Sequence, residues 1–105
     1  MGTAINVVLA PAAVADVRAA RDHYAEVSAE LADAFVEALG RVVERLTAFP
    51  RSGTMVEGFS DLRRARMRRF PYGVFYQLSE PAEVRIVRVL HDRQDRPRGL
   101  DHPEP

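Results

Sequence analysis

The stretch SAELADAFVEALGRVVERLTAF, residues 28–49, decides the fold. Large apolar residues recur in it at steps of three and four, which places them on one side of an α-helix. These residues are Leu31, Phe35, Leu39, Val42, Leu46 and Phe49. Ser28 is suited to cap the first turn, and Pro50 with Gly53 is suited to end the helix. Gly40 costs about 1 kcal/mol against alanine in mid-helix, and we interpret it as a point where a preceding helix comes close.

The residues before this helix predict a strand and a second helix. INVVL at residues 5–9 is short, apolar and rich in β-branched residues, as strands are. Pro11 then suits the first turn of a helix, and Asp16 is expected to stabilise the dipole near the N-terminus of that helix. The apolar positions of this helix are Val14, Val17 and Tyr24. The short connection to the second helix predicts an antiparallel helical hairpin.

The residues after the helix predict three strands. They lie at residues 62–70, 72–78 and 84–91, and turn signals separate them at Pro71-Tyr72-Gly73 and at residues 79–83. The last strand is apolar on both faces apart from two arginines, so we expect it in the middle of the sheet. The resulting order is β-α-α-β-β-β. It predicts an α+β fold, in which a mostly antiparallel sheet carries the helical hairpin on one face.

Composition restricts the remaining possibilities. The 105 residues fit one domain, at residues 1–96, with a charged and proline-rich tail at residues 97–105 that we expect to be flexible. Net charge is zero, which excludes a wholly basic nucleic-acid coat. No cysteine is present, which excludes disulfides and thiolate metal sites. The longest apolar stretch, residues 4–15, is too short for a membrane helix and follows no positive charge, so we expect a cytoplasmic protein without a membrane partner.

Motifs for catalysis are scarce. The three histidines have no neighbours at metal-ligand spacing, and the sequence holds neither a glycine-rich phosphate loop nor a G-x-S-x-G nucleophile. We therefore expect no metal and no cofactor. His91 is a candidate general base, since its ordinary pKa lies near 6.5. The simpler interpretation is a histidine at a strand end, paired with Asp92 or Asp95.

Five arginines fall in the predicted strand LRRARMRRF, residues 62–70. Period-two alternation predicts Arg63, Ala65, Met67 and Arg69 on one face and Arg64, Arg66, Arg68 and Phe70 on the other. Either face would present guanidinium groups about 6.6 Å apart. Such a row suits nucleic-acid phosphates or an acidic protein partner. It also suits an edge strand whose charges prevent sheets from aggregating.

These residues resemble the ParE/RelE superfamily of toxins from bacterial toxin–antitoxin modules, and within it the ParE branch, the plasmid stabilisation family. The resemblance runs from about residue 5 to residue 96. It rests on Pro11-Ala12, Asp16-Val17 and Tyr24 in the first helix, on Leu46 before Pro50 and Gly53, and on two later motifs. These motifs are RFPYGVFY at residues 69–76 and VRIVRVLHDRQD at residues 84–95. The fold that the resemblance implies has the same β-α-α-β-β-β order.

The branch of the superfamily determines the expected activity. RelE-type members are ribosome-dependent mRNA endoribonucleases that use basic residues and often a tyrosine near the C-terminus. ParE-type members lack that set and typically inhibit DNA gyrase. In this chain no tyrosine follows Tyr76 and no lysine is present, while arginine does not deprotonate and so serves poorly as an acid or a base. These absences favour a gyrase inhibitor that is not an enzyme. The alternatives are a ribonuclease acting on the ribosome and mRNA with His91 as its base, and a non-toxic relative that only binds an antitoxin.

The resemblance also implies partners and contact surfaces. For the target, we expect contacts from Arg63, Arg66, Arg68, Arg69, His91 and Arg93. For a ParD-like antitoxin, we expect contacts from Val14, Val17, Tyr24, Phe35 and Tyr76. The antitoxin would form a hetero-oligomer with the toxin, either by placing a helix in the groove of the helical hairpin or by adding a strand to a sheet edge.

Overall fold

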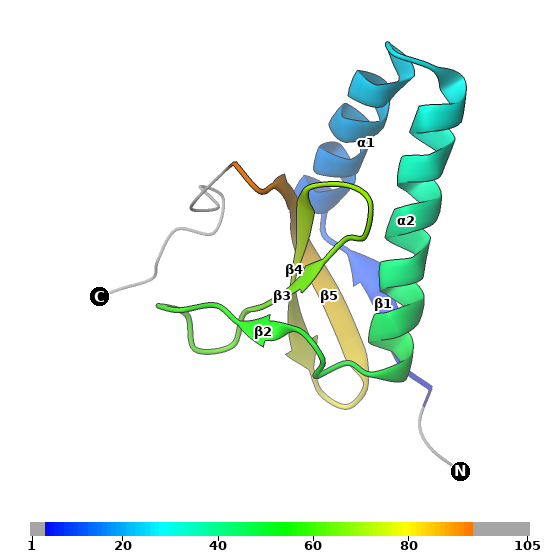
Figure 1. Cartoon of the computed structure of the whole chain (residues 1–105). Coiled ribbons are helices and arrows are strands. Elements are labelled where there is room, and N and C mark those ends of the chain that lie inside the picture. The colour runs from blue at the N-terminus through cyan, green and yellow to red at the C-terminus, as the bar shows by residue number, and fades with distance from the viewer. Residues whose placement is uncertain (1–3, 94–105) are drawn as a thin grey trace.

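A computed structural model describes residues 4–93 of the chain as one sheet with two helices on one of its faces (Figure 1). The elements are β1 (Asn6–Leu9), α1 (Pro11–Ala25), α2 (Ala29–Ala48), β2 (Thr54–Met55), β3 (Arg63–Arg66), β4 (Tyr72–Ser79) and β5 (Glu83–His91). The sheet order is β1-β5-β4-β3-β2. β1 runs parallel to β5, and the other neighbouring strands are antiparallel. This confirms the predicted α+β fold. The end of the predicted domain and the tail at residues 97–105 lie outside the described residues.

Helix α2 follows the predicted apolar pattern as far as Leu46, but the interpretation of Gly40 fails. Ser28 caps it as expected, because its Oγ accepts a hydrogen bond from the Leu31 amide at 3.0 Å. Phe49 follows the last helical residue and is 66% exposed, so the buried stripe ends at Leu46. The interpretation of Gly40 is wrong. It is exposed, and a Cβ built there meets nothing within 4 Å, so no helix comes close at this position.

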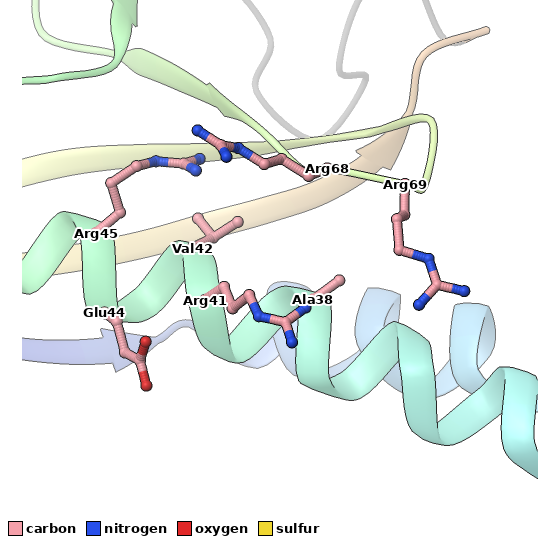
Figure 2. Close-up of a pocket in the computed structure, with 7 residues that line it drawn as sticks. All are labelled: Ala38, Arg41, Val42, Glu44, Arg45, Arg68 and Arg69. Atoms are coloured by element: carbon pink, nitrogen blue, oxygen red, sulfur yellow. The ribbon is translucent and has the colours of Figure 1, made fainter.

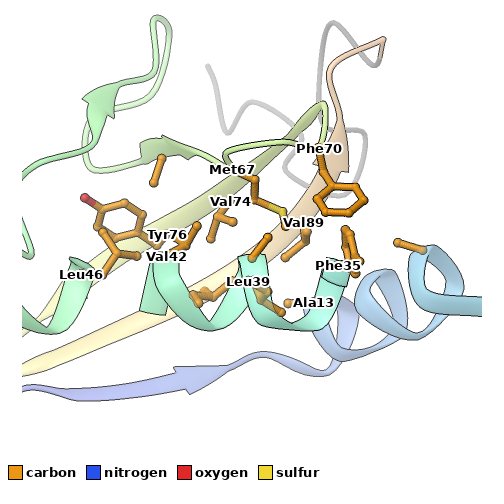
Figure 3. Close-up of a cluster of buried hydrophobic side chains, with 14 of the residues drawn as sticks. Ala13, Phe35, Leu39, Val42, Leu46, Met67, Phe70, Val74, Tyr76 and Val89 are labelled. Atoms are coloured by element: carbon orange, nitrogen blue, oxygen red, sulfur yellow. The ribbon is translucent and has the colours of Figure 1, made fainter. Parts of the chain in front are cut away.

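The main core fills the space between the two helices and the sheet (Figure 3). Phe35 and Val42 of α2 pack there against Val74 and Tyr76 of β4 and Ile86 of β5. A smaller cluster covers the opposite face of the sheet and is formed by Leu62, Phe75 and Leu90, with Val56, Phe59 and Val87 packed against it. Strands β4 and β5 are therefore buried on both faces, which confirms the central position predicted for the last strand.

Tyr76 fixes the loop after α2 to the sheet. The tyrosine is fully buried, and its Oη donates a hydrogen bond to the Pro50 carbonyl and accepts one from the Gly53 amide, both at 2.8 Å. A Cβ at Gly53 would lie only 2.6 Å from this oxygen. The buried hydroxyl is thus satisfied by loop backbone that only glycine allows to approach so closely.

The predicted strand at residues 62–70 is too long, because β3 ends before Met67. Arg69 adopts a left-handed conformation with φ of 77°, which breaks the extended alternation. Phe70 consequently enters the main core together with Ala65 and Met67. The prediction that Phe70 faces away from Ala65 and Met67 is therefore wrong.

The turn before β4 also differs from the prediction. Tyr72 and Gly73 already belong to β4, and Gly73 pairs with Arg66 of β3. The tight bend lies at Pro71 instead, where the Tyr72 amide donates a hydrogen bond to the Phe70 carbonyl at 2.8 Å. Strand β2 was not predicted, because two residues carry no readable alternation.

Candidate functional site

An open hollow of about 570 Å³ lies between helix α2 and the β3–β4 loop (Figure 2). We call it the arginine hollow. It is lined by Ala38, Arg41, Val42, Glu44, Arg45, Arg68 and Arg69. Four of these side chains are guanidinium groups and one is a carboxylate, so the lining carries a clear positive charge. Ala38 and Val42 of α2 lie at its floor and are buried, so the arginine side chains form most of its accessible surface.

Two local features bring the four arginines together. Arg41 and Arg45 lie one helical turn apart on α2, so they point to the same side. Arg45 Nη2 also donates a hydrogen bond to the Arg66 carbonyl at 2.7 Å, which holds α2 beside the end of β3. The left-handed conformation of Arg69 turns the loop so that Arg68 and Arg69 both line the hollow. In Figure 2 the side chains of Arg45 and Arg68 extend toward one another from the helix and the loop.

A second group of charges lies where β5 ends. Asp92 Oδ1 binds Arg64 Nη2 at 2.6 Å, and Asp92 Oδ2 lies 3.4 Å from Arg66 Nη2. The Asp92 amide donates to the Pro71 carbonyl at 2.7 Å. Asp92, suggested as a partner of His91, thus pairs with two arginines, and the other suggested partner, Asp95, lies outside the described residues.

His91 lies beside Tyr72 at the same end of β5. Their ring centroids are 5.2 Å apart, and His91 Nδ1 accepts a hydrogen bond from the Arg93 amide at 3.0 Å. Burial, and next the neighbouring Tyr24, raise the pKa of Tyr72 above its usual 10.0. Tyr72 therefore stays protonated near neutral pH and is a poor general base there.

The predicted target-binding residues separate into three places. Arg68 and Arg69 lie in the arginine hollow, while Arg66, His91 and Arg93 lie near the ends of β3 and β5. Arg63 faces the loop after α2, where its Nη1 donates to the carbonyls of Arg51 and Gly53, both at 3.1 Å. Sequence reasoning missed Arg41, Arg45 and Asp92, because charged residues on an exposed helix face or after a strand are common and give no signal of a site.

Two of the five predicted antitoxin-binding residues belong to the interior, and the other three are half-buried. Phe35 and Tyr76 are both 0% exposed, so neither offers surface to a partner in this conformation. Val17 and Tyr24 are half-buried and pack against the main core, and Val14 is half-buried beside them on α1. Tyr24 stacks within an aromatic group, and its ring centroid lies 5.5 Å from that of Phe35 and 5.1 Å from that of Phe70.

Asp16 has a role that the sequence did not reveal. Its carboxylate accepts hydrogen bonds from Arg88 Nε at 2.7 Å, from Arg88 Nη2 at 2.9 Å and from the Val89 amide at 2.9 Å. The two side chains are only 14% and 19% exposed, and the hydrogen bond with Asp16 raises the pKa of Arg88. Through these contacts Asp16 joins α1 to β5. The predicted interaction with the helix dipole is wrong, because Asp16 lies beyond the first turn of α1.

Residues 4–93 offer neither a cluster of metal-ligating side chains nor a membrane-spanning helix. No group of three or more histidine, cysteine, aspartate or glutamate side chains in this range could hold a metal ion. No helix in the same range is long and apolar enough to cross a membrane. The planar guanidinium groups of the arginine hollow are suited to bind carboxylates or phosphates, and they keep their protons near neutral pH.

Comparison with known proteins agrees with the fold. Among solved structures, the chain is similar to one from the "Chromosomal ParDE TA system from P. aeruginosa", with a TM-score of 0.68, 23% identity and coverage of 83% of this chain and 95% of that chain. No curated protein matches the sequence. Residues 7–96 match the family model described as "ParE toxin of type II toxin-antitoxin system, parDE". Because this match spans most of the chain, the protein belongs to the ParE toxin family of type II toxin–antitoxin systems.

Proposed function

We propose that this ParE-family toxin inhibits DNA gyrase by binding to it and that a ParD-like antitoxin neutralises it. The observation that carries the proposal is the family match over residues 7–96. Inhibition would trap a complex of gyrase with cleaved DNA and so block replication. Because gyrase acts on the bacterial chromosome, the toxin would work in the cytoplasm.

We place the gyrase-binding surface at the ends of β3 and β5 and on the β3–β4 loop. It comprises Arg66, Arg68, Arg69, His91 and Arg93. The four arginines among them are exposed, and exposed charges guide a protein partner by local complementarity even when the net charge of the chain is zero. We leave Arg63 out of this surface because its guanidinium binds the loop after α2.

The geometry near His91 supports binding over RNA cleavage. Cleavage of RNA by its 2′-hydroxyl needs a general base and a general acid, each worth about 10²–10⁴-fold in rate. Tyr72, whose pKa is raised by burial, is a poor general base near neutral pH, which leaves His91 as the candidate base here. The remaining cations of the surface are arginines, which hold their protons.

We place the antitoxin on the helical hairpin. Val14, Val17 and Tyr24 each leave part of their surface open on α1. Val27 and Val36 add exposed apolar surface at the start and along the length of the second helix, with 71% and 44% of each exposed. An amphipathic antitoxin helix would cover these side chains in a helix-in-groove arrangement.

A gyrase assay tests the proposed target. Purified toxin is added to gyrase, ATP and relaxed plasmid, with a quinolone as the positive control for trapped cleavage complexes. We expect linear DNA after detergent and protease treatment. The variant R66Q/R68Q/R69Q should lose this effect, whereas R51Q/R85Q, which removes two exposed arginines elsewhere, should retain it.

The failed assay also has a defined meaning. If wild-type toxin leaves supercoiling and cleavage unchanged at micromolar concentration, gyrase is not the target. Toxin is then added to a translating extract and the mRNA ends are mapped. Cut mRNA would establish the ribonuclease, for which H91A should abolish cleavage. Intact mRNA would leave a non-toxic relative that binds an antitoxin.

A further inference from the structure

We propose that the arginine hollow receives the carboxylates of an acidic, amphipathic segment of the antitoxin. The inference rests on the proposed function, since it assigns one part of the antitoxin to one place on the toxin. The arginine hollow is a different site from the groove of the helical hairpin, because it lies between α2 and the β3–β4 loop (Figure 2).

The charges of the hollow are the first argument. Four guanidinium groups line it against one carboxylate, Glu44. Across residues 4–93, no ion pair joins Arg41, Arg68 or Arg69 to an acidic side chain, and Arg45 is bound to a backbone carbonyl that leaves its charge uncompensated. Crowding of like charges is unfavourable, so a partner that brings two or more carboxylates relieves it. Each carboxylate can accept paired hydrogen bonds from a guanidinium.

The shape and lining of the hollow favour a peptide over a nucleic acid. Ala38 and Val42 form its floor but are only 3% and 1% exposed, so a ligand would contact the arginine side chains, whose methylene stems and guanidinium groups suit a peptide carrying carboxylates. A volume of about 570 Å³ lies within the range of sites that enclose a ligand the size of a few side chains. The net charge of zero weakens the long-range attraction that a nucleic-acid polyanion would need.

The spacing of the arginines gives the expected form of the segment. Arg41 and Arg45 are separated by one turn of α2, about 6 Å along the helix axis. Two glutamates or aspartates four residues apart on a helix have the same spacing. A small residue between them would leave room for the arginine side chains, and a further carboxylate would reach the loop arginines.

Occupation of the hollow would also act on the target surface. Arg68 and Arg69 belong both to the hollow and to the proposed gyrase-binding surface. An antitoxin segment bound there would cover these two arginines while it holds Arg41 and Arg45. Neutralisation would then be direct competition for Arg68 and Arg69.

The test uses full-length toxin and NMR of the arginine Nε–Hε groups, which reports each guanidinium separately. The probe is a helical peptide with glutamates four residues apart and alanine between them, and its control carries glutamine in place of glutamate. We expect the glutamate peptide to shift the signals of Arg41, Arg45, Arg68 and Arg69, with smaller effects at Arg18 and Arg51. The glutamine peptide should leave all six signals unchanged.

Affinity for the antitoxin provides the second measurement. The antitoxin copurified with the toxin is separated, and its affinity is measured for wild-type toxin, R41Q/R45Q and R51Q/R85Q, with circular dichroism as the check of folding. We expect R41Q/R45Q to bind about tenfold more weakly, because two charge-assisted contacts at an open site are lost. R51Q/R85Q loses the same charge outside the hollow and should bind like wild type.

Three results would overturn the inference. They are unchanged hollow signals with the glutamate peptide, stronger shifts of those signals with a short DNA duplex than with the peptide, and equal antitoxin affinity for R41Q/R45Q and wild type. None of these measurements contains gyrase. A toxin that fails in the gyrase assay yet shows the expected shifts and loss of affinity would therefore disprove the target and leave the antitoxin site established.

Discussion

Asp16 shows how much one residue contributes to this fold. It joins α1 to β5 through a two-point ion pair with Arg88 and a hydrogen bond from the Val89 amide. Replacement by alanine leaves a largely buried guanidinium and a backbone amide without their acceptor. We expect D16A to lower the free energy of unfolding by about 2–3 kcal/mol, below the range for a fully buried pair because both side chains keep some exposure.

Urea denaturation checks this value, with D22A as the matched control. Asp22 pairs with Arg21 on the same helix, but both side chains are more than half exposed. Exposed ion pairs stabilise weakly, so D22A should change the free energy of unfolding by less than about 0.5 kcal/mol. Equal effects of the two substitutions would show that the contact with Arg88 does not stabilise the fold.

Tyr72 predicts a stability change at alkaline pH. Burial raises its pKa in the folded chain above the usual 10.0, so the unfolded chain loses this proton first as pH rises. The contribution of Tyr72 is therefore complete below pH 10 and is lost as pH climbs through the raised pKa. Urea midpoints across this range should fall more steeply for wild type than for Y72F, and parallel curves would contradict the prediction.

Sequence reasoning located residues well where the signal was local. Ser28 was identified as a cap because a cap and its acceptor amide are three residues apart. The partner of Asp16 was missed because Arg88 lies 72 residues away, and nothing in either neighbourhood links them. Phe35 and Tyr76 were assigned to a contact surface from their type, while the packing of the whole domain buries both.

At the scale of elements, two glycines predict opposite effects of one substitution. Gly40 is exposed in α2 with open space around it, so G40A should stabilise the protein by about 0.5–1 kcal/mol through helix propensity. Gly53 lies against Tyr76, which the core holds fixed, so G53A should destabilise by about 1–3 kcal/mol through overpacking.

Thermal unfolding of the two glycine variants checks both signs in one experiment. Y76F adds a control for the loop, because it removes the hydroxyl that Pro50 and Gly53 share. If G53A were neutral in wild type, the loop after α2 would be free to move away from Tyr76. If G40A were destabilising, its backbone would require glycine for a reason other than space.

Strand β3 shows where side-chain alternation no longer predicts the direction of the side chains. Alternation along residues 62–70 described an extended strand, but pairing with β4 ends at Arg66. The left-handed backbone at Arg69 then reverses the expected direction of the side chains that follow. A positive φ is uncommon for residues other than glycine, asparagine and aspartate, so an arginine at position 69 did not indicate a left-handed conformation. The arginine hollow exists because of this departure.

At the scale of the whole molecule, charge should control association with the target. The net charge is zero, so attraction depends on the exposed arginines of the gyrase-binding surface. The Debye length is about 10 Å at 0.1 M ionic strength, and added salt shortens it, so the attraction between exposed charges weakens. We expect inhibition of gyrase to weaken with salt more steeply for wild type than for R69Q, which removes one cation and keeps the rest of the surface. Inhibition that is independent of salt would place the binding energy in apolar contacts instead.

The overall topology was largely predictable, and its reasons are physical. One long amphipathic helix needs an apolar sheet face, and three segments with turn signals supply it. The apolar residues on both faces of the last strand correctly indicated an interior position in the sheet, which it takes between β1 and β4. The parallel pairing of β1 with β5 was beyond the sequence, because pairing over such a distance follows from packing and leaves no local pattern.

That parallel pairing has a consequence for synthesis on the ribosome. β1 is made first, yet its strand partner, β5, spans Glu83–His91 and is made last. The sheet and the Asp16–Arg88 pair can close only after nearly the whole described chain has left the exit tunnel. A nascent chain or a truncated product that ends before Glu83 has an unpaired first strand and lacks Arg88, the partner of Asp16, together with His91 and Arg93. We therefore expect such fragments to remain unfolded, so the sheet forms late, after its last strand has been made.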